Sequence, residues 1–389
     1  MTQSMIRPVT PADYREYARR RLPGFLFHYI DGAANEERTA DRNQSDFGRW
    51  QLRQRVMRDV SGVSTAARLA GEDVALPLAL APVGLTGMFA RRGEASAGRA
   101  AARVGVPMGL STVSICSIRE VQAAGPAVWF QLYMLRDRDL VLQLLEQAWE
   151  SGVRTLLFTV DLAMEGVRHR DIRSGMVGST LRARLGRAWQ IVSHPRWVWD
   201  VGLRGRPHTF GNLGFFDTAS NDLNAYKSFI AGQFDRAVTW EDIGWLREHW
   251  QGRLYIKGVL CEEDARAAAE RGADGVVVSN HGGRQLDEVS STIGKLPEVV
   301  AAVGDQLEVL LDGGVRSGLD IVRAVALGAR GVLIGRPFVY ALAARGEAGV
   351  HDLLATLQHE MTVAMALMGV TQVNELNPDC LQYCGPERV

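Results

Sequence analysis

Residues 279–287, SNHGGRQLD, place several chemically active side chains directly after the apolar run Val276–Val278, which predicts a buried strand. His281 is a candidate general base, because imidazole changes its protonation near neutral pH. Arg284 carries a planar guanidinium that can bind a carboxylate through two parallel hydrogen bonds. The two glycines between them would let the backbone approach a ligand closely. This spacing favours proton abstraction from an acid substrate, although an ordinary strand-end histidine would explain His281 by itself.

Three further charged residues follow apolar runs elsewhere in the chain. Asp161 ends TLLFTVD and could orient the imidazole and raise its basicity. Arg168, in GVRHRD, could be a second carboxylate ligand, or a solvated charge in an arginine-rich loop. Lys257, in LYIKGV, would be costly to bury without a function, so it either stabilises an anionic ring system or pairs with a carboxylate.

Two glycine turns predict a phosphate site. Asp312, Gly313 and Gly314 end one apolar run, and Gly335 with Arg336 ends the next. Glycine turns expose backbone N–H groups, and an arginine pairs with a phosphate dianion. The alternative is a pair of tight turns without a ligand.

These residues need a scaffold that brings the ends of several strands together. Eight short apolar runs alternate with amphipathic helical patterns, which is typical of parallel β/α units. The expected strands are residues 78–83, 106–112, 127–133, 155–161, 254–259, 275–280, 309–314 and 331–336. We therefore predict a (β/α)₈ TIM barrel, in which polar residues at the carboxyl ends of the strands meet at one mouth. An open doubly wound sheet is less favoured, because no GxGxxG turn follows the first strand.

The expected organisation is one domain spanning residues 1–389. It comprises an N-terminal helical region (1–75), the barrel (76–350), an insertion after the fourth strand (162–240) and a C-terminal helix and tail (351–389). A connection as long as this insertion should be functional, helical, or both.

The insertion has a distinct composition. Residues 172–215 hold seven arginines and three tryptophans but one acidic residue, Asp200. Arginine with tryptophan is typical of a segment that lies on an anionic membrane surface. The alternative is a loop folded over the barrel with its tryptophans buried.

The bulk composition excludes several classes of protein. The 44 basic residues balance the 44 acidic ones, so no global field favours nucleic acid. The four cysteines form neither a CxxC pair nor a cluster with histidine, so no metal site is expected. The first 25 residues lack the apolar core of a signal peptide, and no apolar stretch suits a membrane span, which predicts a chain that stays on the cytoplasmic side.

The motifs together carry a resemblance. SNHGGRQLD, with QLY, TVD, IKG and LDGGVR, resembles the family of FMN-dependent L-2-hydroxy acid dehydrogenases and oxidases over nearly the whole chain. FLFHYIDGAANE and HPRWVWDVGLRGRPH are most similar to its bacterial respiratory L-lactate dehydrogenases.

The resemblance implies roles for individual residues. His281 matches the catalytic base, with Asp161 as its partner. The substrate would be held by Tyr29, Tyr133, Arg168 and Arg284. The residues that match the FMN site are Pro82, Val83, Gly84, Ser111, Gln131, Thr159, Lys257, Ser279, Asp312, Gly313, Gly314, Arg316, Gly335 and Arg336.

The resemblance also implies an activity and a place in the cell. We expect oxidation of L-lactate to pyruvate by FMN, with the electrons passed to a quinone or the respiratory chain. The enzyme would be peripheral to the inner membrane, on its cytoplasmic face. It would be a homo-oligomer resembling the family's tetramers. Three alternatives stay open: an oxidase that releases hydrogen peroxide, a dehydrogenase of mandelate or another 2-hydroxy acid, and a barrel that binds FMN or phosphate without turnover. Gly84, in Pro-Val-Gly where many family members have Pro-Thr-Ala, favours a dehydrogenase.

Overall fold

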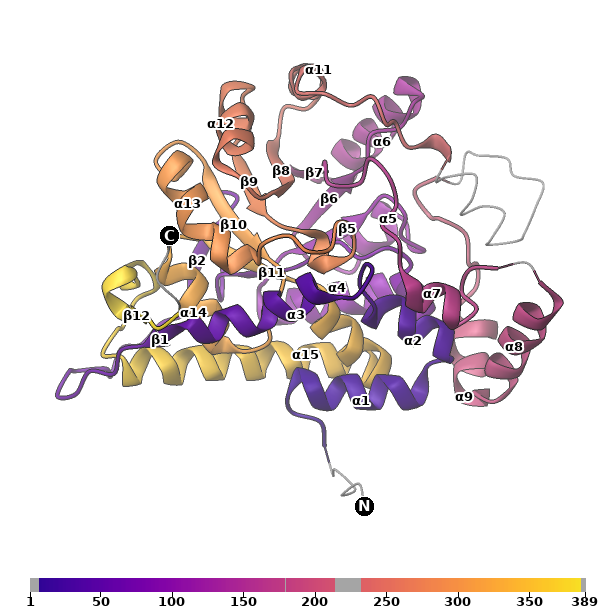
Figure 1. Ribbon diagram of the computed structural model, residues 1–389, viewed down its shortest axis with the longest axis horizontal. Helices are drawn as coiled ribbons and strands as arrows, with labels where there is room; N and C mark the ends of the chain where they lie inside the picture. The colour runs from indigo at the N-terminus through magenta and orange to yellow at the C-terminus, as the bar shows by residue number, and fades with distance from the viewer. Residues whose placement is uncertain (1–6, 179, 214–231, 386–389) are drawn as a thin grey trace.

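A computed structural model describes residues 7–178, 180–213 and 232–385, and in it eight parallel strands close into a barrel (Figure 1). The strands follow one another around the barrel in chain order, and the last, β11, pairs with the first, β4. Their bounds are β4 Leu78–Leu80, β5 Met108–Ser111, β6 Val128–Leu132, β7 Thr155–Thr159, β8 Arg253–Val259, β9 Gly275–Val278, β10 Glu308–Asp312 and β11 Gly331–Ile334. The predicted TIM barrel is confirmed.

Most strands end earlier than the sequence predicts. For example, β7 ends at Thr159 and β9 at Val278, so Asp161 and His281 both lie beyond the ladder. The apolar residues form the ladder hydrogen bonds and are buried on both faces of the sheet, as in other parallel sheets. The polar residues that follow them lie beyond the ends of the strands. These polar residues are therefore carried on the loops at the mouth of the barrel.

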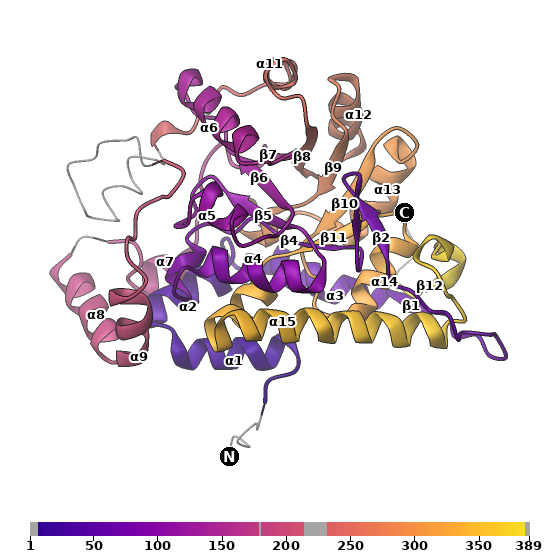
Figure 2. The same cartoon turned by 180° about the vertical axis from the view of Figure 1, so that it is seen from behind.

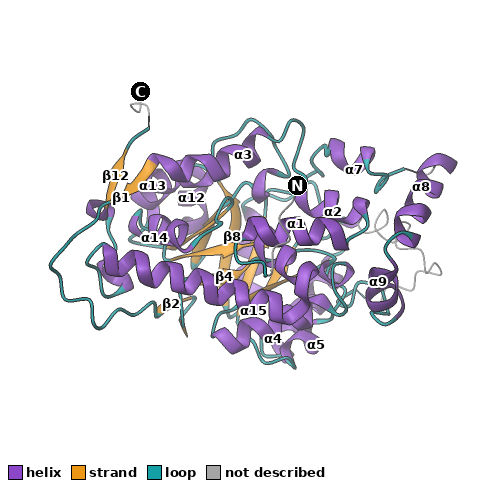
Figure 3. Ribbon diagram, turned by 90° about the horizontal axis from the view of Figure 1, so that it is seen from below, coloured by secondary structure: helices purple, strands orange, loops and turns teal. Residues whose placement is uncertain are grey.

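Helices cover the outside of the barrel (Figure 3). They are α4 Gly93–Val104, α5 Ile118–Gln122, α6 Arg138–Glu150, α11 Glu241–His249, α12 Glu262–Glu270, α13 Thr292–Val303, α14 Gly318–Ala326 and α15 Arg336–Leu367. In α6 the Asp137 side chain accepts hydrogen bonds from the backbone N–H groups of Asp139 and Leu140 and caps the helix. The buried residues of α6 recur three and four apart, so one stripe faces the barrel.

A β-hairpin closes the amino-terminal end of the barrel. Strands β2 (Ala67–Leu69) and β3 (Glu72–Val74) pair with each other, and Leu69 and Val74 pack into the barrel interior with Trp129 and Tyr255. The Ala70 N–H donates to the Glu308 carboxylate at the start of β10. Only the carboxyl-terminal end of the barrel is thus left for a site.

The terminal regions pack on each other. Helices α1 (Pro11–Arg21), α2 (Gly24–Asp31) and α3 (Arg38–Ser45) confirm the helical character of the N-terminal region, and α15 lies against both α1 and α4 (Figures 1 and 2). Strand β1 (Trp50–Leu52) pairs with β12 (Leu381–Tyr383) near the other end of the chain. The backbone of α15 breaks from helical geometry at Arg345 and Gly346, close to the predicted start of the C-terminal region.

The insertion after β7 forms a separate helical group at one end of the molecule (Figures 1 and 2). It contains α7 (His169–Arg173), α8 (Leu181–Val192), α9 (Pro195–Trp197) and the π-helix Val198–Leu203, while residues 214–231 of the predicted insertion lie outside the described residues. None of the helices described here has both the length and the apolar composition needed to cross a membrane.

Candidate active site

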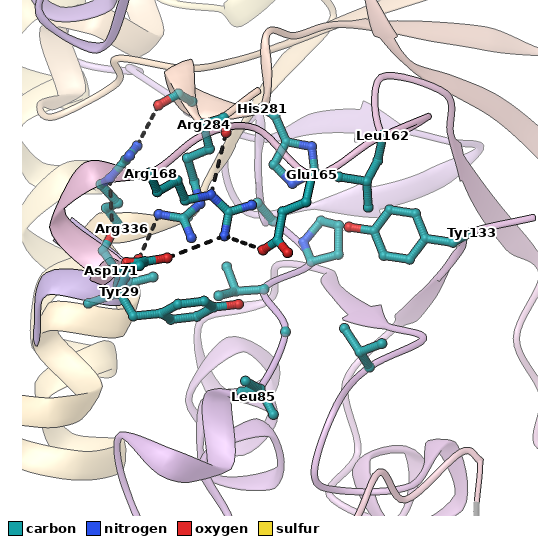
Figure 4. Close-up of a pocket in the computed structure, with 18 of the residues that line it drawn as sticks. Tyr29, Leu85, Tyr133, Leu162, Glu165, Arg168, Asp171, His281, Arg284 and Arg336 are labelled. Atoms are coloured by element: carbon teal, nitrogen blue, oxygen red, sulfur yellow. Dashed lines mark hydrogen bonds and ion pairs between the residues drawn. The ribbon is translucent and has the colours of Figure 1, made fainter. Parts of the chain in front are cut away.

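A cavity of about 1160 Å³ lies at the carboxyl-terminal end of the barrel and reaches the insertion. Figure 4 shows part of its lining. It is lined by residues in or just after the carboxyl-terminal parts of strands β4, β5, β6, β8, β9, β10 and β11, by α2, and by the insertion itself. All of the residues predicted for the site line this cavity except five: Ser111, Gln131, Thr159, Asp161 and Ser279.

His281 is paired with a carboxylate. Its Nδ1 lies 2.8 Å from Oδ1 of Asp161, and the imidazole is directed into the cavity (Figure 4). A carboxylate at Nδ1 fixes the tautomer with the proton on that nitrogen, which leaves the Nε2 lone pair facing the cavity. Burial raises the pKa of Asp161, but the charge and hydrogen bond of His281 and the charge of Lys257 outweigh it and leave the pKa below its usual value. The carboxylate is thus ionised at neutral pH.

The pairing depends on a glycine in the strand between the two partners. Asp161 follows β7 and His281 follows β9, and β8 lies between these strands. Gly258 of β8 has φ +114°, at a register shift in the ladder, and a Cβ there would lie 2.7 Å from the Asp161 Cβ. The missing side chain lets Asp161 lie against β8 and reach His281. Sequence reasoning assigned Gly258 no role, although an isolated glycine in a strand is the signal for such a bulge.

His281 itself has a left-handed backbone, with φ +56°. Such a conformation costs of order 1–3 kcal/mol for a residue other than glycine. It is held by the His281 N–H, which donates to Ser279 Oγ, and by the contact of the ring with Asp161. The surrounding structure therefore stabilises a strained residue in order to aim the imidazole.

Two arginines share one wall of the cavity with an aromatic ring. The guanidinium of Arg284 lies 5.0 Å from the centre of the Tyr29 ring, and that of Arg168 lies 6.0 Å from it. Burial, together with the charge of Arg168, lowers the pKa of Arg284 to about 9. Two cations held this close in a buried wall favour an anionic ligand.

Arg284 and Arg336 also fix the C-terminal end of α2. Arg284 donates to the carbonyls of Tyr29 and Gly32, and Arg336 donates to those of Ile30, Gly32 and Gly282. The last carbonyls of a helix have no partner within the helix and carry partial negative charge, so cations stabilise them. These bonds hold Tyr29 at the cavity and use three of the five N–H groups of Arg336.

Tyr133 faces the two arginines from the opposite side of the cavity (Figure 4). Its ring centre lies 5.0 Å from that of Phe234, which belongs to the insertion. Burial and the charge of Asp161 raise the pKa of Tyr133 above its ordinary value. Its hydroxyl therefore keeps its proton and can donate a hydrogen bond.

Asp31, at the end of α2, joins four helices. Its buried carboxylate accepts hydrogen bonds from Arg15 of α1, Arg170 of α7 and Tyr340 of α15. Burial raises the pKa of Asp31, but these three hydrogen bonds outweigh it and leave the pKa far below its usual value. The network fixes α2 and α7, which carry Tyr29 and Arg168.

Replacing Asp31 with asparagine should lower the free energy of unfolding by about 1.5–3 kcal/mol at pH 7, the usual contribution of hydrogen bonds to a charged group. The native pKa of Asp31 lies below that of the unfolded chain, so its contribution is complete above about pH 4 and is lost as the pH falls further. Urea unfolding at pH 7 and near pH 3 would measure this, and a difference between variant and wild type that does not shrink in acid would contradict it.

A buried ion pair lies beside the imidazole–carboxylate pair. The Nζ of Lys257 lies 2.7 Å from Oδ2 of Asp312 and donates to Ser279 Oγ at 2.9 Å. Burial lowers the pKa of Lys257, but Asp312 and Asp161 outweigh it and raise the pKa above its ordinary value. Lys257 is therefore a permanent cation in the cavity wall. It pairs with a carboxylate, which is one of the two roles predicted for it from the sequence.

Several buried polar atoms around the barrel mouth lack a hydrogen-bond partner among the described residues. They are Nε2 of Gln131, Oγ1 of Thr159, Oδ2 of Asp161 and Oδ1 of Asp312. The Gln131 side chain is oriented by Ser111 Oγ, which donates to its Oε1 at 2.9 Å. Buried polar groups are rarely left unsatisfied, so this ring of donors and acceptors fits a flat ligand with polar edges.

The predicted phosphate end is also assembled at the cavity. Arg316, Gly335 and Arg336 line it together with Gly313 and Gly314. Burial is the main cause that lowers the pKa of Arg316, to about 10, and within the described residues its guanidinium has no carboxylate at ion-pair distance. A partly buried guanidinium that lines the cavity, with no counter-ion among the described residues, suits an added anion.

Two of the predicted glycines lie directly against α3, where a side chain would not fit. Gly314 has φ +91°, and a Cβ there would lie 1.8 Å from the Asn43 carbonyl oxygen. A Cβ on Gly283 would lie 2.7 Å from the Ala40 backbone nitrogen. Gly283 was expected to let the backbone approach a ligand closely, but the atoms that approach it are those of Ala40: its small size lets α3 pack on the loop.

Sequence reasoning also missed the acidic partners of Arg168. Glu165 Oε1 lies 3.0 Å from the Arg168 Nη1, and Asp171 Oδ2 lies 3.7 Å from it. Both residues are three positions from Arg168 in the chain, and this spacing was the available signal.

Comparisons with known proteins agree with this geometry. An L-lactate dehydrogenase of Caulobacter sp. (strain K31) is 55% identical over 370 residues, which cover 95% of this chain and 97% of the relative. A crystal structure of the monotopic membrane protein (S)-mandelate dehydrogenase has a TM-score of 0.90 and 36% identity, covering 97% of this chain and 99% of the other. A crystal structure of mandelate oxidase has a TM-score of 0.82 and 37% identity over 97% and 98% of the two chains. The profile of the FMN-dependent dehydrogenases matches residues 18–383, and the chain belongs to this family.

Proposed function

We propose that the chain oxidises L-lactate to pyruvate with FMN as its cofactor and passes the electrons to a quinone. The observation that carries this proposal is the meeting of a carboxylate-paired imidazole and two arginines in one cavity, in a chain 55% identical to an L-lactate dehydrogenase. A general base beside a carboxylate site is what the oxidation of a 2-hydroxy acid requires.

The residues around the cavity fit FMN. The unsatisfied donors and acceptors of Gln131 and Thr159 suit the polar edge of the flavin ring, and Lys257 supplies a cation that offsets negative charge on it. Arg316 and Arg336, with Gly313 and Gly335, would hold the phosphate. The remaining predicted contacts are Pro82, Val83, Gly84, Ser111, Ser279, Asp312 and Gly314. When bound, FMN supplies a two-electron acceptor for the hydrogen on C2 of the substrate.

The side chains then divide the remaining work. Arg168, Arg284 and Tyr29 hold the substrate carboxylate, and Tyr133 donates a hydrogen bond near the substrate hydroxyl. The Nε2 of His281 takes the hydroxyl proton as the C2–H bond breaks and the C–O bond becomes C=O. Asp161 stabilises the imidazolium that this transfer creates. The product is pyruvate.

Anaerobic mixing of purified holoenzyme with L-lactate tests the activity. We expect the visible flavin band to bleach with L-lactate, and D-lactate to leave it unchanged. Because two of the similar structures are enzymes named for mandelate, (S)-mandelate belongs in the same series. Absence of bleaching with L-lactate would contradict the proposal. Faster bleaching with (S)-mandelate than with L-lactate would show that mandelate is the preferred substrate. Peroxide formed stoichiometrically under air would identify an oxidase instead.

The outer face of the insertion supports a second part of the proposal, attachment to the cytoplasmic face of the inner membrane. Four apolar residues follow one stripe of α8 and are 62–73% exposed: Leu181, Leu185, Trp189 and Val192. Trp199 is 60% exposed nearby, whereas Trp197 is buried and donates to the Met88 carbonyl, as in the folded-over alternative. Exposed apolar side chains within an arginine-rich segment suit an anionic lipid surface, and a similar structure is described as a monotopic membrane protein.

A double variant, Leu185→Ser with Trp189→Ser, should release the enzyme from anionic vesicles without changing its reduction by lactate. Removing two large apolar side chains should lower the partition coefficient about a hundredfold or more, since each contributes about 1.5–3 kcal/mol when fully buried. The control is Met57→Ser, because Met57 is 100% exposed in the loop after β1. This loop lies at the end of the molecule opposite α8 (Figure 1). Equal vesicle binding by both variants would exclude α8 as the attachment site.

The cavity offers the electron acceptor a route from this surface. Beyond the catalytic residues it is lined by apolar residues of the insertion, among them Met176, Val177, Phe210 and Phe234, and by the arginines Arg184, Arg187 and Arg236. Apolar walls with a few polar groups suit the ring of a lipid-soluble quinone, and the arginines can donate hydrogen bonds to its carbonyl oxygens.

We also propose that the chain functions as one domain and assembles as a tetramer. The first part is supported by α15, which packs against both α1 and α4 and so joins the two terminal regions to the barrel. The second is implied by the family resemblance, and light scattering of the purified protein tests it.

A further inference from the structure

Glu165 is an acidic side chain in the wall of the active-site cavity. Its carboxylate points toward the guanidinium of Arg168, and the Oε1–Nη1 distance is 3.0 Å (Figure 4). The Glu165 side chain is 67% exposed, whereas that of Arg168 is 8% exposed. A carboxylate open to solvent thus engages a buried cation to which the proposed function assigns the substrate carboxylate.

The backbone beside Glu165 is held in place. A Cβ on Gly166 would lie 2.4 Å from the Arg284 carbonyl oxygen, so this loop packs directly on the chain after β9. On the other side, Gln285 Nε2 donates to the carbonyls of Met164 and Asp161. Any movement of the Glu165 carboxylate must therefore come from rotation of its own side chain.

Arg168 keeps other partners when Glu165 moves. Asp171 Oδ2 lies 3.7 Å from the Arg168 Nη1 and its side chain is 7% exposed, and the Arg168 Nε donates to the Arg284 carbonyl at 3.4 Å. These partners belong to the folded frame, because α7 and the loop after β9 carry them. Glu165 is the partner that an incoming carboxylate can replace.

We propose that Glu165 occupies Arg168 until the substrate carboxylate displaces it, and that it thereby lowers substrate affinity and selects against a second negative charge. The proposal rests on the proposed function only for the role of Arg168. Displacement weakens substrate binding, because the ion pair between Glu165 and Arg168 must break before the substrate carboxylate can pair with Arg168. The displaced carboxylate stays beside the bound ligand, where like charges repel, so a 2-hydroxy acid with one carboxylate is preferred to one with two.

Glu165→Gln in the holoenzyme tests this, since glutamine keeps the shape and removes the charge. We expect the KM for L-lactate to fall roughly three- to tenfold, the size of one partly exposed ion pair, with kcat unchanged. Calorimetry with two non-reacting probes, oxamate with one carboxylate and tartronate with two, should show tighter binding of oxamate by a similar factor and a larger gain for tartronate.

The matched control is Glu150→Gln. Glu150 is 57% exposed and pairs with Arg119 at 3.4 Å on the outside of the barrel, so its loss removes the same charge and a comparable surface ion pair. This variant should leave KM, kcat and both dissociation constants unchanged. Flavin content and thermal midpoint of both variants check that they fold.

The outcomes separate this proposal from the function itself. If wild-type enzyme is reduced by L-lactate while Glu165→Gln shows unchanged or weaker oxamate binding, the role of Glu165 is wrong and the function stands. If L-lactate fails to reduce the wild type, oxamate binding to the two variants still decides the role of Glu165. A fall in kcat in Glu165→Gln would mean that Glu165 takes part in the chemical step, which contradicts the proposal. If oxamate and tartronate gained the same factor in affinity, the part of the proposal that concerns selection against a second negative charge would be wrong.

Discussion

Replacing His281 with asparagine should slow flavin reduction by L-lactate by about 10²–10⁴-fold, the usual contribution of a positioned general base. Asparagine suits the test because it tolerates the left-handed backbone that His281 adopts at φ +56°. It cannot accept a proton at the position of Nε2. Stopped-flow absorbance under anaerobic conditions measures the rate, at saturating substrate, so that any change in affinity is kept apart from the chemical step.

Asp161→Asn is the companion variant, because it removes the negative charge next to the imidazole and keeps a side chain of the same shape. It should slow the same step by a smaller factor, since the imidazolium that forms in this step loses the partner 2.8 Å from its Nδ1. Unchanged flavin content in both variants shows that the site is intact. A His281→Asn rate within threefold of wild type would exclude His281 as the base.

Replacing Lys257 with methionine should lower the free energy of unfolding by about 3–5 kcal/mol, because it leaves the buried Asp312 carboxylate without its cation. Asp312 has one oxygen, Oδ1, already without a partner in the described part of the chain, so it has little alternative stabilisation. Urea unfolding at a fixed FMN concentration measures the effect, since bound cofactor adds to apparent stability.

A double-mutant cycle isolates the ion pair from the size of the side chain. Asp312→Asn alone should also destabilise, because it leaves the Lys257 ammonium buried with Ser279 as its remaining hydrogen-bond partner. The double variant should be less destabilised than the sum of the two single ones, as expected for groups in direct contact. Strict additivity would show that the 2.7 Å contact contributes nothing to stability.

Most of the scaffold follows from local sequence. Each of the eight apolar runs forms a strand of the barrel, because such a run can bury itself only between neighbours covered by helices. Strands that run parallel end on the same side, so polar residues after Val278 and Asp312 had to meet at one mouth wherever the barrel closed. The positions of His281, Arg284 and Lys257 were predictable for this reason.

The contacts within the mouth are different, because they join residues far apart in the chain. Asp161 reaches His281 across β8 only because Gly258 leaves a gap in that strand. Tyr29 reaches the cavity because Arg284, after β9, and Arg336, at the start of α15, bind the end of α2. Such distances depend on packing that no local pattern encodes. The sequence determined which chemical groups face the cavity, and the tertiary structure decided which of them pair, including the contact of Arg168 with Glu165.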